Sequence, residues 1–196
     1  MLGAPPEGLE SFRCALAVIV PFFVGGLFQT AFLKHPVSER FSAPIDGGAE
    51  LLGQPIFGQN KTWRGFVVLI PVVTLLFGAT GGILGRDPAG VWSLTLDQWF
   101  LLGFGSVLAY SLGELPNSFV KRRLGINPGE APSSRGAKLI ALVVDQLDSI
   151  AAALLVIGLM VPTDIWFFVW SVLIGGILHY GFNILLYAIG LKSRAA

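Results

Sequence analysis

Residues 138–160 read KLIALVVDQLDSIAAALLVIGLM, an apolar run that carries two carboxylates, Asp145 and Asp148. A helix needs about 20 mostly apolar residues to cross the hydrocarbon core of a bilayer, so this run is long enough. An ionised carboxylate within the bilayer is costly unless it faces a cavity, a cation or another polar partner. The run therefore predicts a membrane helix whose polar side belongs to a site rather than to the lipid.

Four further apolar runs of similar length occur in the sequence, at residues 9–33, 65–85, 99–120 and 164–190. The composition agrees with a membrane protein, because 54% of the 196 residues are hydrophobic and only 13% are charged, against about 25% in soluble domains. A mean hydropathy of +0.73 excludes a second, water-soluble domain. We predict an all-α polytopic membrane protein, a single integral membrane domain over residues 1–196 with about five transmembrane helices and a polar cavity facing the cytoplasm.

The basic residues indicate how the chain is oriented in the membrane. Of the 13 Lys and Arg, 11 fall on one side of the predicted spans, namely Lys34, Arg40, Lys61, Arg64, Lys121, Arg122, Arg123, Arg135, Lys138, Lys192 and Arg194. Only Arg13 and Arg86 fall on the other side. The positive-inside rule then predicts a cell-membrane protein with the N terminus outside, and with the C terminus and the polar site on the cytoplasmic side. The formal net charge of +1 provides no basic surface for a nucleic acid.

The third span carries a polar line at its far end. Its members recur at i, i+3, i+4 and i+7 and are Glu114, Asn117, Ser118 and Lys121. Residues at this spacing share one helix face, which cannot be exposed to lipid. Pro116 lacks a backbone donor, which predicts a kink or an unwound turn. Arg122 and Arg123 could each bind phosphate or rest against lipid headgroups, and the headgroup reading weighs more for Arg123, which lies off the line.

The carboxylate pair of the fourth span offers oxygen ligands one helical turn apart. Helical periodicity brings Asp145 and Asp148 near the same face as Arg135 and Lys138. Mg²⁺ takes one or two carboxylates and completes its shell with water and phosphate oxygens. We therefore predict Mg²⁺ at this pair; the alternative is that the acids form ion pairs with a neighbouring helix.

The loop before the second span ends in a group of hydrogen-bond donors. Asn60, Lys61, Thr62 and Arg64 stand at the N-terminus of that span, where unpaired backbone N–H groups add to the attraction for anions. This position predicts phosphate binding. On the last span, His179 and Asn183 share a face with Tyr187, and His179 could either pack by a hydrogen bond or contribute to the site.

Two of these motifs together resemble a known family of lipid enzymes. Ser118-Phe119-Val120-Lys121-Arg122 followed by Asp145-Gln146-Leu147-Asp148 is similar to the signature of CDP-diacylglycerol synthases. The chain departs from that signature at Asn127-Pro128, at Arg135-Gly136 and at Gln146, which favours a sister family. The segments Pro44-Ile45-Asp46, Asn60-Lys61-Thr62-Trp63-Arg64-Gly65 and Gly113-Glu114-Leu115-Pro116-Asn117-Ser118 resemble those of CDP-archaeol synthases.

The resemblance implies a Mg²⁺-dependent transfer of cytidylate from CTP to a glycerol phosphate with two geranylgeranyl ethers, an isoprenoid ether lipid phosphate, within membrane lipids. It implies catalytic roles for Asp145, Asp148, Lys121 and Glu114, with Glu114 as a further metal ligand or a neighbour of the metal. It implies contacts with CTP or the lipid phosphate for Asn60, Lys61, Thr62, Arg64, Asn117, Ser118, Arg122, Arg135 and Lys138. The attacking phosphate oxygen is already anionic, so alignment and charge neutralisation matter more than a strong base. The sequence makes no prediction of oligomeric state.

Two other functional classes remain as alternatives. A CDP-alcohol phosphotransferase also uses spaced aspartates in a membrane, but it needs four acids over two turns, and here the run stops at Asp148. A small transporter would use a polar stripe as a pathway. The polar residues gather in the cytoplasmic half of the spans, whereas the outer half, such as residues 150–160, is apolar.

Overall fold

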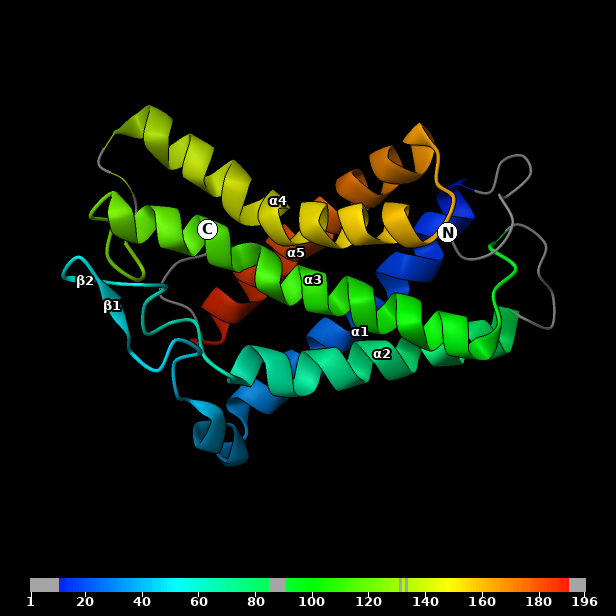
Figure 1. Cartoon of the computed structure of the whole chain (residues 1–196), viewed down its shortest axis with the longest axis horizontal. Coiled ribbons are helices and arrows are strands. Elements are labelled where there is room, and N and C mark those ends of the chain that lie inside the picture. The colour runs from blue at the N-terminus through cyan, green and yellow to red at the C-terminus, as the bar shows by residue number, and fades with distance from the viewer. Residues whose placement is uncertain (1–10, 85–90, 131, 133, 191–196) are drawn as a thin grey trace.

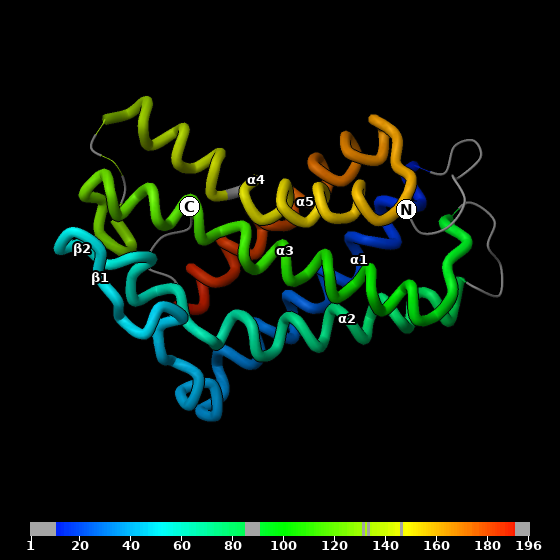
Figure 2. The backbone as a smooth tube through the Cα atoms, in the orientation of Figure 1, coloured from blue at the N-terminus to red at the C-terminus, as the bar shows by residue number. Residues whose placement is uncertain are grey.

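A computed structural model describes residues 11–84, 91–130, 132 and 134–190 of the chain. Its elements are α1 (Ser11–Lys34), the short 3₁₀ helix η1 (Pro36–Phe41), β1 (Glu50–Leu51), β2 (Gln54–Pro55), α2 (Arg64–Leu84), α3 (Leu96–Arg123), α4 (Arg135–Met160) and α5 (Ile165–Ala188). The long helices lie side by side in one bundle, and the all-α prediction is confirmed (Figures 1 and 2). Each predicted span falls on one of the five long helices. Of the 13 basic residues, Arg86, Lys192 and Arg194 lie outside the described residues.

Four of these helices, α1, α2, α4 and α5, are long and apolar enough to cross a membrane. The remaining long helix, α3, has 28 residues but a more polar composition. It lies between α2 and α4 and packs more extensively against them than any other helices pack together (Figure 1). Because α2 and α4 flank α3, the polar residues of α3 can face the interior of the bundle.

The backbone of α3 remains helical through Pro116, so the predicted unwound turn is wrong. A proline removes one intrahelical hydrogen bond, here the one to the carbonyl of Leu112. The flanking turns and the packing of α3 between two helices keep the segment helical. The polar line from Glu114 to Lys121 therefore stays in register along one face.

Close approach of α3 and α4 depends on Gly113. A Cβ atom at this position would lie 2.7 Å from the Cβ of Ala152 and 2.9 Å from the carbonyl oxygen of Asp148. Only a glycine leaves room for this contact. It places Glu114 directly beside the turn of α4 that carries Asp148.

The apolar core is packed around the N-terminal half of α3. Trp99, Leu102 and Val107 of this half are almost fully buried together with Phe77 and Phe167. The same end of the bundle is tied by the indole of Trp92, which donates a 2.7 Å hydrogen bond to the carbonyl of Pro162. The C-terminal half of α3 is thereby left to the polar site.

Candidate active site

A cavity of about 1770 Å³ opens between the helices and reaches the loops that follow α1 and α3. It is lined by every residue that the sequence analysis assigned to the site: Asn60, Lys61, Thr62, Arg64, Glu114, Asn117, Ser118, Lys121, Arg122, Arg135, Lys138, Asp145 and Asp148. These residues come from a loop, from α2, from one face of α3 and from the first half of α4. The structure thus brings together groups that are far apart in the sequence.

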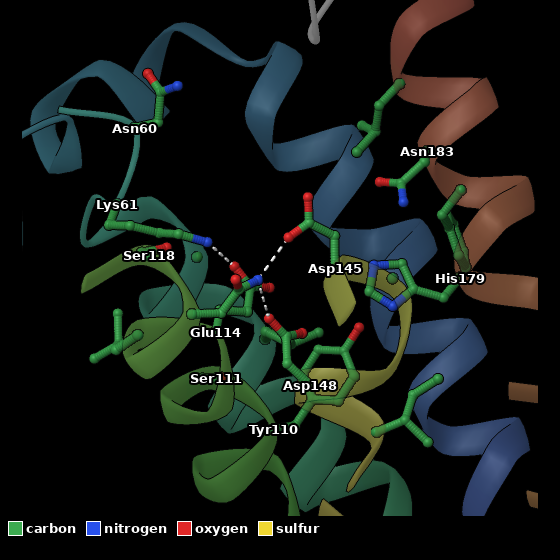
Figure 3. A pocket seen from close by; sticks show the side chains of 18 of the residues that line it. Asn60, Lys61, Tyr110, Ser111, Glu114, Ser118, Asp145, Asp148, His179 and Asn183 are labelled. Atoms are coloured by element: carbon green, nitrogen blue, oxygen red, sulfur yellow. Dashed lines mark hydrogen bonds and ion pairs between the residues drawn. The ribbon is translucent and has the colours of Figure 1, made fainter. Parts of the chain in front are cut away.

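The two aspartates of α4 converge on one amide group. The Nδ2 atom of Asn117 donates to Oδ1 of Asp145 at 2.5 Å and to Oδ2 of Asp148 at 2.9 Å. Figure 3 shows the side chains of Asp145 and Asp148 near each other in the cavity. Asp148 also accepts a 2.7 Å hydrogen bond from the backbone N–H of Ser149. These contacts hold two carboxylates, which would otherwise repel each other, toward the same part of the cavity.

A lysine from α3 neutralises the first of these acids. The ammonium group of Lys121 donates to Oδ2 of Asp145 at 2.6 Å and also contacts Oδ1 of the same carboxylate. The Asp145 side chain is 43% exposed, so the ion pair stands at the open surface of the cavity. A cation is therefore already placed at this carboxylate.

A second ion pair connects the first loop to α3. The ammonium group of Lys61 contacts the carboxylate of Glu114, which lies one helical turn before Asn117 (Figure 3). The predicted donor Lys61 thus reaches the same polar line as Lys121. Asn60 and Thr62, which flank Lys61, also line the cavity.

The carboxylate pair has the donor chemistry that Mg²⁺ prefers. Within the described ranges, no three His, Cys, Asp or Glu side chains are grouped closely enough to hold a metal ion. Mg²⁺ needs only one or two protein carboxylates when phosphates and water complete its shell, so Asp145 and Asp148 suffice. Asp145 forms an ion pair with Lys121 of α3, which is the alternative that the sequence offered for this acid. The oxygens of Asp145 and Asp148 on one side of the cavity still fit a Mg²⁺ ion whose shell is completed by phosphate and water. A metal contact for Glu114 stays a prediction.

Arg122 presents a buried guanidinium to the cavity. Its residue exposure is 6%, and its Nε and Nη1 atoms have no hydrogen-bond partner among the residues that the structure describes. A buried, charged donor without a partner is costly, and a bound anion would supply the missing acceptors. The loops around residues 58 and 128 close over this side chain, since a Cβ at Gly58 would meet Pro128 at 2.8 Å. This environment differs from that of a headgroup anchor in contact with lipid.

Three further basic residues that were predicted to bind phosphate lie at the margin of the cavity. Arg64 forms an ion pair with Glu39 of η1, and Glu39 itself is largely exposed. Arg135 and Lys138 are exposed in the first turn of α4, which Ser134 caps by accepting a 3.2 Å hydrogen bond from the N–H of Ala137. These side chains are therefore accessible to an incoming substrate without any rearrangement of the apolar core.

The deeper part of the cavity contains a group that the sequence analysis did not identify. Tyr110 of α3 lines the cavity beside Asp148, and its ring lies 6.2 Å from that of His179 on α5 (Figure 3). Asn183 is buried one turn further along α5. A tyrosine within an apolar run carries no signal of its own; only its spacing of four from Glu114 places it on the polar face. His179 and Asn183 also line the cavity, and a role for His179 in the site stays a prediction.

The loop that carries Lys61 is folded around Asp46. The carboxylate of Asp46 accepts hydrogen bonds from the backbone N–H groups of Gly48 at 2.9 Å and of Phe57 at 3.0 Å. Partial burial acts to raise the pKa of Asp46, but the backbone donors outweigh it and hold this pKa below the ordinary value. The N–H of Ile45 donates to the carbonyl of Lys61 at 2.9 Å. The Pro44-Ile45-Asp46 motif therefore organises the loop.

Arg123 is not among the residues that line the cavity, and its guanidinium is held by the protein. Its guanidinium donates to the backbone carbonyls of Leu51, Gln54 (3.0 Å) and Pro55 (2.5 Å) in the β1–β2 hairpin. It also lies 5.1 Å from the ring centre of Phe119. Its neighbour Arg122 thus lines the cavity, whereas Arg123 binds the β1–β2 hairpin.

Comparison with known proteins adds an independent observation. The family model described as CarS-like, CDP-archaeol synthase, matches residues 38–195. The curated CDP-archaeol synthase of Saccharolobus islandicus is 31% identical over 172 residues, which is 85% of this chain and 91% of that protein. The protein of the same name from Archaeoglobus fulgidus is 33% identical over 156 residues, or 76% of this chain and 82% of the relative.

A solved structure has a similar fold. It is described as an intramembrane enzyme for archaeal membrane lipid biosynthesis, and it superimposes with a TM-score of 0.56 over 87% of this chain and 92% of its own. Its sequence identity of 24% supports likeness of fold alone.

Proposed function

The chain belongs to the CDP-archaeol synthase family, and from this premise we propose that it joins CTP to a digeranylgeranylglyceryl phosphate, with Mg²⁺, to give CDP-archaeol and pyrophosphate. Family membership makes the protein a CTP-dependent transferase of archaeal lipid synthesis and a multi-pass membrane protein. The identity of the lipid, the need for Mg²⁺ and the roles of individual residues are the proposal.

One observation carries it: the cavity holds a carboxylate pair and several basic side chains beside an apolar wall. Asp145 and Asp148 both accept hydrogen bonds from the amide of Asn117, and the ammonium group of Lys121 donates to Asp145. The walls nearby are apolar and include Phe22 and Leu69. An enzyme that joins a nucleotide to a lipid phosphate needs both the charged side chains, for the phosphates, and the apolar wall, for the lipid chains.

The reaction exchanges one phosphorus–oxygen bond for another. An oxygen of the lipid phosphate attacks the α-phosphorus of CTP, and the bond from that phosphorus to the oxygen bridging the β-phosphate breaks. Both partners are anions, so their mutual repulsion must be neutralised and their approach aligned. Neither step requires a strong general base, because the attacking oxygen carries its charge at neutral pH.

Asp145 and Asp148 would hold Mg²⁺, with Asn117 orienting both carboxylates. The ion, when bound, would screen phosphate charge and orient the phosphate oxygens. Lys121 would transfer its contact from Asp145 to a phosphate oxygen, and the buried guanidinium of Arg122 would donate to another. Lys61 would act in the same way from the loop side.

The cytoplasmic placement of the site is part of the proposal. CTP is a cytoplasmic metabolite, and 11 of the 13 basic residues lie on the side predicted to be cytoplasmic. Cysteines introduced near Pro88 and near Asn127 should differ in labelling by an impermeant reagent, with Pro88 accessible from outside. Equal labelling of both from outside would contradict this orientation.

The catalytic proposal is tested with purified protein in detergent, CTP, Mg²⁺ and digeranylgeranylglyceryl phosphate. Mass spectrometry should detect a CDP-lipid that requires all three additions. A CDP-alcohol phosphotransferase would instead consume a CDP-lipid and release CMP when given an alcohol, and a transporter would form no lipid product. Either of those results would overturn the proposal.

A further inference from the structure

The β1–β2 hairpin beside the end of α3 is too small to be stable alone. Each strand has two residues, with Leu51 opposite Gln54 and Glu50 opposite Pro55. Isolated two-stranded hairpins are marginal even when they are longer. The order of this hairpin must therefore come from contacts outside it.

The turn adds a strain of its own. Leu52 and Gly53 connect the strands with φ angles of 54° and 73°, and positive φ at both positions is typical of a type I′ turn. Asn-Gly suits this turn, whereas leucine at positive φ is unfavourable. Leu52 gains little in return, because it is 90% exposed.

Arg123 supplies the missing support from the C-terminal end of α3. Its guanidinium binds carbonyls on both strands, those of Leu51, Gln54 and Pro55, across about 70 residues of sequence. The ring of Phe119, one turn earlier on α3, lies against the same guanidinium. The hairpin lies beside the C-terminal end of α3 (Figure 1). The Arg123 side chain thus fixes it to the helix that carries Glu114 and Lys121.

The hairpin in turn fixes the segment that carries Lys61. Ile56 directly follows β2, and its N–H donates to the carbonyl of Ala49 at 3.0 Å. The next N–H, that of Phe57, donates to Asp46, and Ile45 donates to the carbonyl of Lys61. Displacement of the hairpin would therefore be transmitted to Lys61.

We propose that Arg123 is a positioning residue for nucleotide transfer: it locks the β1–β2 hairpin on the end of α3 and so holds Lys61 at the cavity. This inference rests on the proposed function for its catalytic consequence. Without Arg123 the loop would be docked in only a fraction of the molecules, and the apparent affinity for the phosphate substrate would fall by that fraction. Saturating substrate would restore the docked loop, so kcat would change little.

The test compares Arg123→Gln with Arg40→Gln, a matched loss of charge at an exposed position of η1. Arg123→Gln should raise the KM for CTP or for the lipid phosphate about 10-fold with kcat within about 2-fold. Hydrogen exchange of residues 44–62 should become faster in the same variant, whether or not activity is measured. Arg40→Gln should alter neither quantity.

A second-site change separates positioning from direct substrate contact. Leu52→Asn relieves the turn, so combining it with Arg123→Gln should lower the raised KM most of the way back to the wild-type value and restore most of the exchange protection. A raised KM with unchanged exchange and no rescue would assign Arg123 to the substrate and overturn its positioning role. Unchanged KM and exchange in Arg123→Gln would overturn it as well. If the wild-type protein forms no CDP-lipid, the proposed function fails, while the exchange measurement still decides whether Arg123 holds the loop.

Discussion

The Lys121 ammonium lies 2.6 Å from Oδ2 of Asp145, on the carboxylate that we assign to Mg²⁺. The charge of this acid is thereby balanced within the protein before any metal or nucleotide arrives. Binding of a metal–nucleotide complex would supply a new cation for the carboxylate and a new anion for the lysine. Because Asp145 would exchange Lys121 for the metal ion while Lys121 would exchange Asp145 for a phosphate, neither charge would be left unpaired in the cavity.

Replacing either acid by its amide should abolish nucleotide transfer. Asp145→Asn and Asp148→Asn each remove an anionic ligand at nearly constant volume, and loss of even an indirect metal contact commonly costs 10- to 100-fold. We expect a decrease of at least about 100-fold in kcat/KM, with an unfolding temperature close to that of the wild type. Initial rates over a Mg²⁺ titration provide the measurement.

Raised Mg²⁺ should partly restore the activity of these two variants. Near-normal turnover of either one at ordinary Mg²⁺ would contradict the metal assignment. Loss of activity accompanied by unfolding would instead assign the pair to the structure of the bundle.

The basic residues of the cavity should respond even to conservative changes. Lys121→Ala and Arg122→Lys should each lower kcat/KM by about 10- to 100-fold, because a hydrogen bond to a charged group contributes about 1.5 to 3 kcal/mol. Arg40→Gln is the control for general loss of positive charge. The measurement is CDP-lipid formation at several CTP concentrations. Mild and equal effects in all three variants would indicate that Lys121 and Arg122 bind lipid headgroups and not the substrate phosphates.

The close contact at Gly113 should tolerate no side chain. Gly113→Ala places a methyl group against Ala152 and the backbone of α4, which should destabilise the protein by about 1 to 3 kcal/mol and displace Asp148. Gly82→Ala is the matched control, since a Cβ there meets nothing within 4 Å. Thermal unfolding in detergent should separate the two variants, and equal unfolding temperatures would show that α3 and α4 can move apart freely.

The loop around Asp46 should loosen in acid. The folded protein lowers the pKa of this carboxyl below the ordinary 3.8, so its stabilising effect is complete above that value and is lost as the pH falls through the lower, folded value. Hydrogen exchange of residues 44–62, corrected for intrinsic rates, should accelerate below about pH 4. Asp46→Asn should show faster exchange already at pH 7 and little further change in acid.

The control for this pH dependence is Asp97→Asn. Asp97 is exposed in the first turn of α3, far along the helix from the loop. Its loss should leave the acid response of residues 44–62 as in the wild type. An acid response that survives in Asp46→Asn would assign it to another group.

The helices and most of the site could be predicted from the sequence because both depend on local periodicity. Apolar runs of sufficient length gave the five long helices, and the i, i+3, i+4 spacing placed Glu114, Asn117 and Lys121 on one face. The same periodicity placed Asp145 and Asp148 together on α4. In the structure, residues of both faces line one cavity.

Other features depend on contacts that have no local signature. The ion pair between Lys61 and Glu114 joins residues 53 positions apart. Arg123 binds backbone carbonyls, and any sequence can offer those, so its role could not be read from the motif beside it. The unbroken passage of α3 through Pro116 depends on tertiary packing, which outweighs the local preference of proline.

The central claim is that cytidylate moves from CTP to a lipid phosphate within this cavity. The most direct measurement supplies CTP labelled either at the α-phosphate or at the γ-phosphate to the purified protein with Mg²⁺ and digeranylgeranylglyceryl phosphate. We predict that the α label appears in the extracted lipid and the γ label in pyrophosphate, and that Asp148→Asn abolishes both. Absence of the α label from the lipid, while the wild-type protein is folded and supplied with all three components, would contradict the account.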